Sequence, residues 1–225
     1  MKKFIYSALC LCVFLSFMGC NDNTKKPKVE DSGLTGKISD NIEFRVSDDN
    51  SKIWLDNSHI EKISLELDEN GKKTLTFTTT EEGKTLLYNA TNENIGKIIS
   101  VGADKYLLSA AMVMVPNESG VFTLNHQFVD YAYLYNYLTD AEDKMNGVTP
   151  PNDLISEDTA KNKVFEHANT TVDKVEGLSV ELKIDEDHFD WKYCINFTVN
   201  GNVYLTEVNA HTGGIIKFWA EHYGN

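Results

Sequence analysis

Strict alternation of apolar and polar residues in the last third of the chain limits its fold more than any other feature. Every second residue of 191–199 is apolar, and residues 177–185 alternate in the same way. Successive side chains of a strand point to opposite faces, so each segment predicts a strand with one buried face. Asn200-Gly201 follows directly and is typical of a two-residue hairpin turn. We therefore predict an antiparallel meander with two further strands, over residues 203–209 and 215–219.

One helix is predicted just before this meander. Ser156 is a favourable N-cap residue, and the acidic residues Glu157 and Asp158 suit the positive end of a helix dipole. Apolar residues at helical spacing continue to a helix end near Asn169. This part of the chain therefore predicts one helix packed on three or four antiparallel strands.

The preceding segment also combines strands with a helix. Strands are expected at residues 43–46 and 63–67, and a hairpin turn at 69–72 leads into a returning strand through Phe77. Threonines at 78–80 and the acidic pair that follows them predict the start of a helix that ends near Gly96. A second hairpin is expected over residues 98–108.

Aromatic residues gather between residues 125 and 145. Positions 128, 131, 135 and 138 share one helical face, which favours a helix, and an alternating strand over residues 131–137 is the alternative. The tyrosines either pack this helix onto its domain or form an aromatic surface for extended peptides. On the second interpretation the candidate ligand-binding residues are Tyr131, Tyr133, Tyr135 and Tyr137.

The predicted fold class is α+β, with two small modules that each pack an antiparallel sheet against one or two helices. The first module covers residues 41–146 and the second covers residues 156–225. The linker between them is residues 147–155, where the paired prolines Pro150 and Pro151 cannot extend a helix.

The N-terminus predicts export and lipid attachment. Two lysines precede an apolar run over residues 4–18, and Gly19 stands before Cys20. This pattern is typical of a lipoprotein signal peptide, residues 1–19, and the run is short for a membrane-spanning helix. An uncleaved membrane anchor is the alternative. Cys20 would carry acyl chains such as palmitate, and residues 20–40 would form a flexible tether. The expected location is the extracytoplasmic face of the cell membrane.

Charge excludes one large class of partners. The sequence has 21 basic and 34 acidic residues, a net charge of −13. Removal of the signal peptide takes away two lysines and no acidic residue, which leaves a net charge of −15. Such a surface repels phosphate backbones, so we expect no binding to nucleic acid.

No pattern in the sequence predicts catalysis. The histidines lack metal-binding spacing, and the phosphate-binding and nucleophile motifs are missing, so we expect no catalytic residue, no metal ion and no cofactor. Cys194 is the only thiol left after processing and lipid attachment, and its neighbours are those of an ordinary strand residue. Glu207 is the one strand carboxylate that could act as a base, and a structural ion pair is its alternative role.

The first module resembles the head of the first large extracytoplasmic domain of SecD/SecDF, the membrane partners of the Sec translocon. The segments that carry this resemblance are 43–49, 78–84, 94–97, 107–111, 119–120 and 122–124. The resemblance implies a surface that contacts emerging polypeptide chains. Proton-driven pumping is not implied, because that family places it in membrane helices. Ala111 stands where that family usually has proline.

The second module resembles a PepSY domain. The residues that carry the resemblance are 156–160, 193–197, Asn200-Gly201 and, above all, 204–216. PepSY domains are associated with proteases, as inhibitory or propeptide-like modules, and with lipoproteins of the cell envelope. The resemblance therefore implies protein binding and no catalytic residues.

These observations predict a non-catalytic lipoprotein of the cell envelope whose partners are the membrane, through its lipid, and proteins or peptides. It would assist secretion or folding, or restrain an envelope protease. The alternative is a structural adaptor that docks on the Sec translocon or on other envelope machinery.

Overall fold

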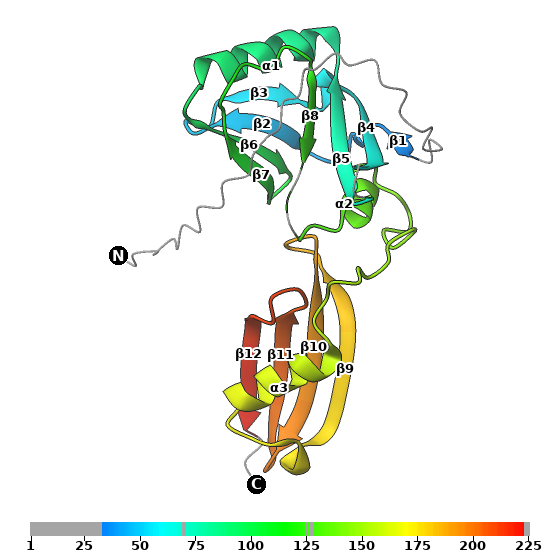
Figure 1. Cartoon of the computed structure of the whole chain (residues 1–225), viewed down its shortest axis with the longest axis vertical. Coiled ribbons are helices and arrows are strands. Elements are labelled where there is room, and N and C mark those ends of the chain that lie inside the picture. Colours follow the sequence, from blue (N-terminus) through cyan, green and yellow to red (C-terminus); the bar gives the residue numbers. More distant parts are fainter. Residues whose placement is uncertain (1–32, 69–70, 125, 127, 223–225) are drawn as a thin grey trace. The chain divides into compact units, whose positions relative to one another are not determined.

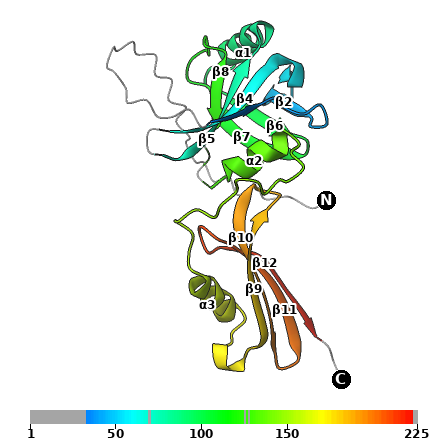
Figure 2. The same cartoon turned by 90° about the vertical axis from the view of Figure 1, so that its right-hand side faces the viewer.

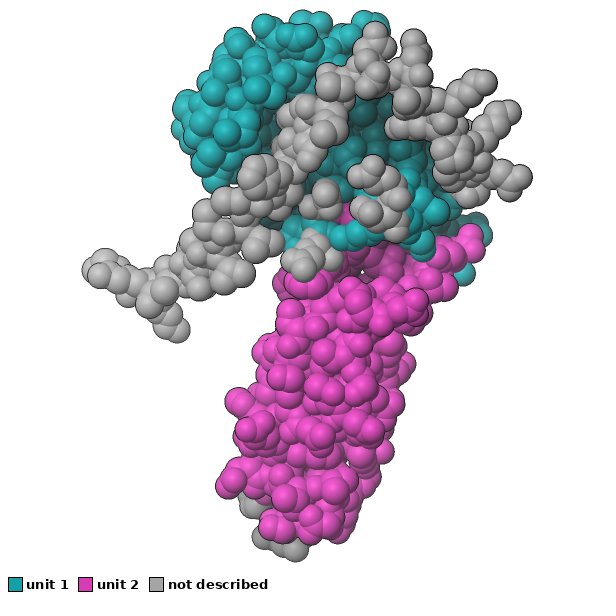
Figure 3. Space-filling model, in the orientation of Figure 1, with its two compact units in different colours: residues 1–126, 135–144 teal, residues 127–134, 145–225 magenta. Residues whose placement is uncertain are grey.

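The computed structural model describes residues 33–68, 71–124, 126 and 128–222, which form two compact units (Figures 1 and 3). Unit 1 comprises the described residues up to His126 together with residues 135–144, and unit 2 comprises residues 128–134 and 145–222. Both units combine antiparallel sheets with few helices, which confirms the predicted α+β class. The predicted signal peptide, Cys20 and residues 69–70 of the predicted turn lie outside the described residues.

Unit 1 contains two four-stranded antiparallel sheets. The first has the order β1-β4-β5-β8, with β1 Leu34–Gly36, β4 Ile60–Leu67, β5 Lys73–Thr79 and β8 Val121–Leu124. The second has the order β3-β2-β6-β7, with β3 Ile53–Asp56, β2 Phe44–Asp48, β6 Ile98–Ala103 and β7 Tyr106–Met112. Between the sheets the ring of Phe77 stacks on Phe44 at 5.3 Å and on Phe122 at 4.9 Å. Aromatic side chains from both sheets therefore share one core.

Helix α1, Glu81–Glu93, packs on the strands of unit 1. It lies where the sequence predicted a helix. The Thr80 hydroxyl accepts a hydrogen bond from the Gly83 N–H, so Thr80 is the N-cap. A short 3-10 helix, η1 Asn57–His59, lies close to α1. A Cβ atom on Gly83 would lie only 2.3 Å from the His59 carbonyl oxygen, so a residue without a side chain is needed there.

The sequence analysis did not predict three strands of unit 1, which are β1, β3 and β8. β1 lies inside the segment that we expected to be a tether, and it pairs antiparallel with β4. Main-chain hydrogen bonds to β4 hold β1 in place. A strand of three residues is too short to show the alternation of polarity from which a strand is predicted. β8 follows Gly120 and pairs with β5. Its side chains show no strict alternation of polarity, so pattern reasoning did not detect it.

Residues 131–138 form helix α2, Tyr131–Leu138, so the alternative of a strand is wrong. The side chains of Tyr131, Tyr133 and Tyr135 are 2 %, 6 % and 8 % exposed. Tyr137 is half-buried, and its hydroxyl donates a hydrogen bond to the Asp104 carboxylate. These tyrosines therefore do not form the open aromatic surface that we considered, because packing on the protein buries most of each ring.

From residue 157 onwards, unit 2 consists of one α-helix on an antiparallel meander, as predicted (Figure 2). Helix α3, Glu157–His167, begins after its N-cap Ser156. A 3-10 turn, η2 Val172–Lys174, leads into strands β9 Glu176–Asp185, β10 Asp190–Val199, β11 Asn202–Asn209 and β12 Ile215–His222. Their order in the sheet is β12-β11-β10-β9.

The predicted alternation in unit 2 is confirmed on β10. All five apolar residues at alternate positions from Trp191 to Val199 are buried, and with α3 they form the core. At the turn Asn200 and Gly201 have φ angles of 50° and 77°, as a two-residue hairpin with positive φ at both positions requires. On β9 the corresponding residues Val180, Leu182 and Ile184 are only partly buried and Leu178 is exposed, because β9 is an edge strand.

Candidate functional site

Strand β7 is the least protected edge among the described strands. It lies at the end of its sheet, and its seven residues, Tyr-Leu-Leu-Ser-Ala-Ala-Met, contain no charge and no proline. The other uncharged edges, β1 and β8, have three and four residues, and the longer edges β9 and β12 carry charged side chains. Proteins usually protect a long edge with charge, proline or a bulge, because its unpaired N–H and C=O groups can bind another strand.

The only such protection on β7 is a break in register near Leu108. Val101 of β6 pairs with Ser109, whereas Gly102 pairs with Leu107, so Leu108 is left without an opposite residue. Residues 109–112 then pair with β6 in regular antiparallel register. In this regular stretch every second residue directs its N–H and C=O groups away from β6. This stretch can therefore form a hydrogen-bonded ladder with one more strand.

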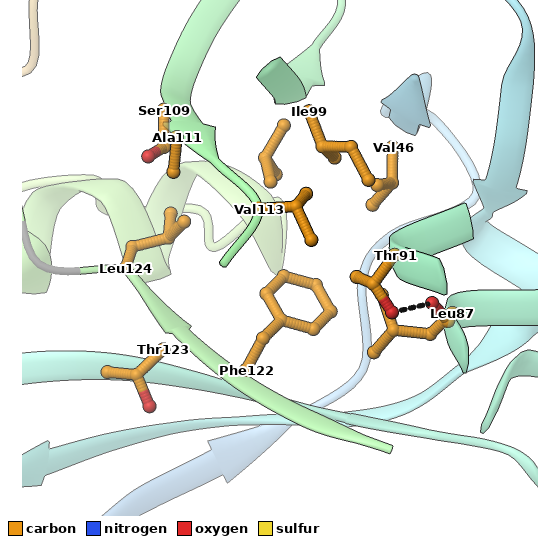
Figure 4. Close-up of a pocket in the computed structure, with 11 residues that line it drawn as sticks. Val46, Leu87, Thr91, Ile99, Ser109, Ala111, Val113, Phe122, Thr123 and Leu124 are labelled. Atoms are coloured by element: carbon orange, nitrogen blue, oxygen red, sulfur yellow. Dashed lines mark hydrogen bonds between the residues drawn. The ribbon is translucent and has the colours of Figure 1, made fainter. Parts of the chain in front are cut away.

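A pocket of about 70 Å³ lies beside β7, inside unit 1 (Figure 4). It is bounded on one side by β7 and the residue that follows it, and on another by β8, the edge strand of the other sheet. Helix α1 and the inner faces of β2 and β6 complete it. The lining residues are Val46, Leu87, Thr91, Ile99, Val101, Ser109, Ala111, Val113, Phe122, Thr123 and Leu124.

The polar atoms of the lining are mostly occupied by partners within the protein. The Thr91 hydroxyl donates to the Leu87 carbonyl at 2.8 Å (Figure 4). It also accepts from the Asn117 N–H at 2.8 Å. The Thr123 hydroxyl lies 3.2 Å from that of Thr76, within hydrogen-bonding distance. The buried side-chain atoms without a hydrogen bond in the described residues belong to Thr170 and His211, neither of which lines the pocket. The pocket therefore suits an apolar group.

Alternation along β7 separates two kinds of surface. Ser109 and Ala111 line the pocket, so Ala110 and Met112 point to the opposite face of the sheet. On that face Met112 lies opposite Ile98 on β6, and these residues are 54 % and 47 % exposed. Both faces of β7 therefore present uncharged surface in a strongly acidic protein.

Glu207 has a structural role in unit 2. Its carboxylate lies 3.0 Å from the Lys192 ammonium, which also lies 3.6 Å from Asp185. Burial opposes the charged form of Lys192, but the hydrogen bond that Lys192 donates to Glu207 and the charge of Asp185 outweigh burial and raise the pKa of Lys192. Glu207 therefore has the structural role that was the alternative to a catalytic base, because its carboxylate forms an ion pair with a lysine.

The surroundings of Cys194 and His211 favour a structural role for both side chains. Burial foremost, and then the charge of Glu207, raises the pKa of the Cys194 thiol, which disfavours the reactive thiolate. The Nδ1 atom of His211 lies 2.8 Å from the Asp190 carboxylate without the alignment of a hydrogen bond, and both side chains are 7 % exposed. Asp190 also accepts from the side chain of Asn209 at 2.7 Å. The described residues contain no cluster of three or more metal-ligating side chains.

Comparison with known proteins adds little to this site. No protein-family model and no curated protein matches the sequence. One similar solved structure is SecDF, a membrane component that enhances protein export, with 15 % identity and a TM-score of 0.34 over 37 % of this chain. The match spans about half of that chain, 54 %.

A second similar structure is a candidate lipoprotein from Clostridium difficile 630. The identity is 15 %, the TM-score is 0.26, and the match covers 72 % of this chain and 82 % of that chain. At these scores neither similarity assigns a family or a function. None of the described helices has the length and apolar character needed to cross a membrane.

Proposed function

We propose that this protein is a non-catalytic, lipid-anchored protein of the cell envelope that binds extended polypeptide by adding it as a strand to β7. The observation that carries the proposal is a seven-residue edge strand without charge, placed beside an apolar pocket. Main-chain hydrogen bonds along an edge recognise many sequences, which suits a protein that assists secretion or folding.

Two further observations support this location for the site. The tyrosines of α2, which were the sequence-based candidates, are largely buried, whereas Leu107 and Met112 of β7 are 68 % and 54 % exposed. The protein is also strongly acidic, so the uncharged surface around β7 is unusual for this chain. The lipid anchor at Cys20 would hold this surface close to the membrane, where exported chains emerge.

Binding by strand addition has a specific signature in the peptide. The full-length chain in lipid nanodiscs is titrated into a fluorescent twelve-residue peptide with an uncharged centre and lysines at both ends, and anisotropy is recorded. We expect a Kd in the micromolar range. Two variants of the peptide carry N-methyl groups on every second central residue or on every central residue. A strand bonds to an edge through alternate residues, so the first variant should retain binding through its unmethylated edge and the second should lose it.

Two results would contradict the proposal. Equal binding of the two N-methylated peptides would exclude a ladder along β7. No binding of any peptide by a correctly folded protein, together with one dominant membrane partner in crosslinking experiments in cells, would favour the structural adaptor. Empty nanodiscs serve as the control for binding to lipid.

Restraint of a protease by the PepSY-like module stays a prediction. On the face of the sheet opposite α3, Leu205 lies opposite Trp219, and these residues are 39 % and 44 % exposed. A pair of exposed apolar side chains on a sheet can contact another protein. Affinity capture from membranes, compared between the intact chain and Trp219→Ser, tests whether this pair contributes to any partner.

A further inference from the structure

The pocket beside β7 has the size and chemistry to select the side chain of the bound strand. This inference rests on the proposed function, because it assigns a preference to the polypeptide that β7 binds. The geometry points to one aliphatic side chain, of valine, leucine or isoleucine, as the anchor that enters the pocket. Aromatic and charged side chains are excluded from it.

The position of the pocket makes it accessible to an added strand. Such a strand would lie about 4.8 Å from β7 in the plane of the sheet. Its side chains would point alternately to the two faces, in step with those of β7. The side chains on the inner face would lie next to Ser109 and Ala111, which line the pocket, and opposite Phe122 of β8. One of these side chains can therefore enter while its neighbours in sequence point to the opposite face.

The volume sets the upper limit on the anchor. An apolar protein cavity of about 150 Å³ takes up benzene, and the present pocket, at about 70 Å³, has roughly half of that volume. An aliphatic side chain of three or four carbon atoms fits, whereas a phenyl ring requires the walls to move. Those walls include the buried side chains of Leu87, Val113 and Leu124, which leave little room for adjustment.

The chemistry of the lining sets the polarity of the anchor. Two of the three hydroxyl groups in the lining, those of Thr91 and Thr123, have partners within the protein, and that of Ser109 has none among the described residues. A charged or amide side chain would therefore lose its hydration and gain few hydrogen bonds in return. Each CH₂ group buried in such a site is expected to tighten binding about fourfold.

A guest series tests the preference directly. The lysine-flanked peptide of the strand-addition assay carries one central guest residue, which is Ala, Val, Leu, Phe or Asp. With the full-length chain in nanodiscs we expect the leucine peptide to bind at least tenfold more tightly than the alanine peptide. The phenylalanine and aspartate peptides should bind no more tightly than alanine. Equal affinity of all five peptides would overturn the anchor and leave strand addition intact, whereas no binding at all would overturn both.

Adjacent alanines on β7 provide a matched pair of variants. Ala111→Leu places an aliphatic side chain of the protein itself in the pocket, whereas Ala110→Leu adds the same side chain on the opposite face. We expect Ala111→Leu to reduce the preference for leucine over alanine to less than threefold. Ala110→Leu should keep that preference. Equal effects of the two variants would refute the pocket as the anchor site.

A third variant keeps the test independent of any instability in Ala111→Leu. Val113 is buried and lines the pocket, so Val113→Ala enlarges it. We expect this variant to bind the phenylalanine peptide at least fivefold more tightly than the original protein does, with folding confirmed by circular dichroism. An unchanged order of guest preferences in folded Val113→Ala would count against the inference.

Discussion

Replacing Gly83 by alanine should destabilise unit 1, although helix propensity predicts the opposite. Gly83 is a buried residue in the first turn of α1. In an exposed helix interior, alanine is more favourable than glycine by about 1 kcal/mol. At Gly83 the added Cβ atom would lie 2.3 Å from the His59 carbonyl oxygen and 3.0 Å from the Cβ atom of Thr79. The two effects therefore have opposite signs.

The clash is the larger effect. Ordinary contacts of a Cβ atom begin near 3.4 Å, so α1 must move away from the main chain of His59 by about 1 Å. Overpacking of this kind costs typically 1–3 kcal/mol, and the gain in helix propensity offsets part of it. We expect a net loss of about 1–2 kcal/mol. For a unit of this size the melting temperature should fall by roughly 4–10 °C.

Scanning calorimetry on Gly83→Ala and on Asn92→Ala separates the two effects. Asn92 is exposed on the same helix, so alanine there changes propensity without a clash. We expect the first variant to melt at a lower temperature than the original protein and the second at the same or a slightly higher temperature. A higher melting temperature for Gly83→Ala would show that α1 can move away freely, and the packing argument would fail.

Three further predictions concern single side chains. The pKa of Asp56 is lowered, foremost by the hydrogen bond that the Ser58 hydroxyl donates to it. The Asp56 carboxylate therefore stabilises the fold above its unfolded pKa of about 3.9. This stabilisation is lost as the pH falls through the pKa of Asp56 in the folded protein. Urea unfolding should therefore show that Asp56→Asn loses less stability than the original protein between about pH 4 and pH 2. Burial raises the pKa of Cys194, so mass spectrometry should find slower alkylation by iodoacetamide at pH 7 in the folded chain than in urea. Ser156→Ala removes the N-cap hydrogen bond of α3 and should cost unit 2 about 1 kcal/mol, and a full effect with Ser156→Thr as well would contradict a capping role.

The candidate site was only partly accessible to sequence reasoning. The hairpin was predicted over residues 98–108, so the prediction covers the first three residues of β7 and not residues 109–112. The lack of charge in those four residues is visible in the sequence. The position of β7 at the edge of a sheet depends on which strands pair, and strands β3 and β8 were not predicted. The tyrosines were a reasonable candidate surface on composition, but burial is a property of packing between elements distant in sequence, which a local pattern does not encode.

Local sequence patterns were sufficient to predict the meander of unit 2, the N-cap Ser156, a helix start at the threonines 78–80, and the hairpin at Asn200-Gly201. These features depend on the alternation of side chains along a strand and on hydrogen bonds between residues a few positions apart, so the information is local. Three other features appear only in the tertiary fold. β1 pairs with β4, the Lys192 ammonium forms an ion pair with the Glu207 carboxylate, and a pocket lies between β7 and β8. Those features require residues up to tens of positions apart to meet, and only the folded chain brings them within contact distance.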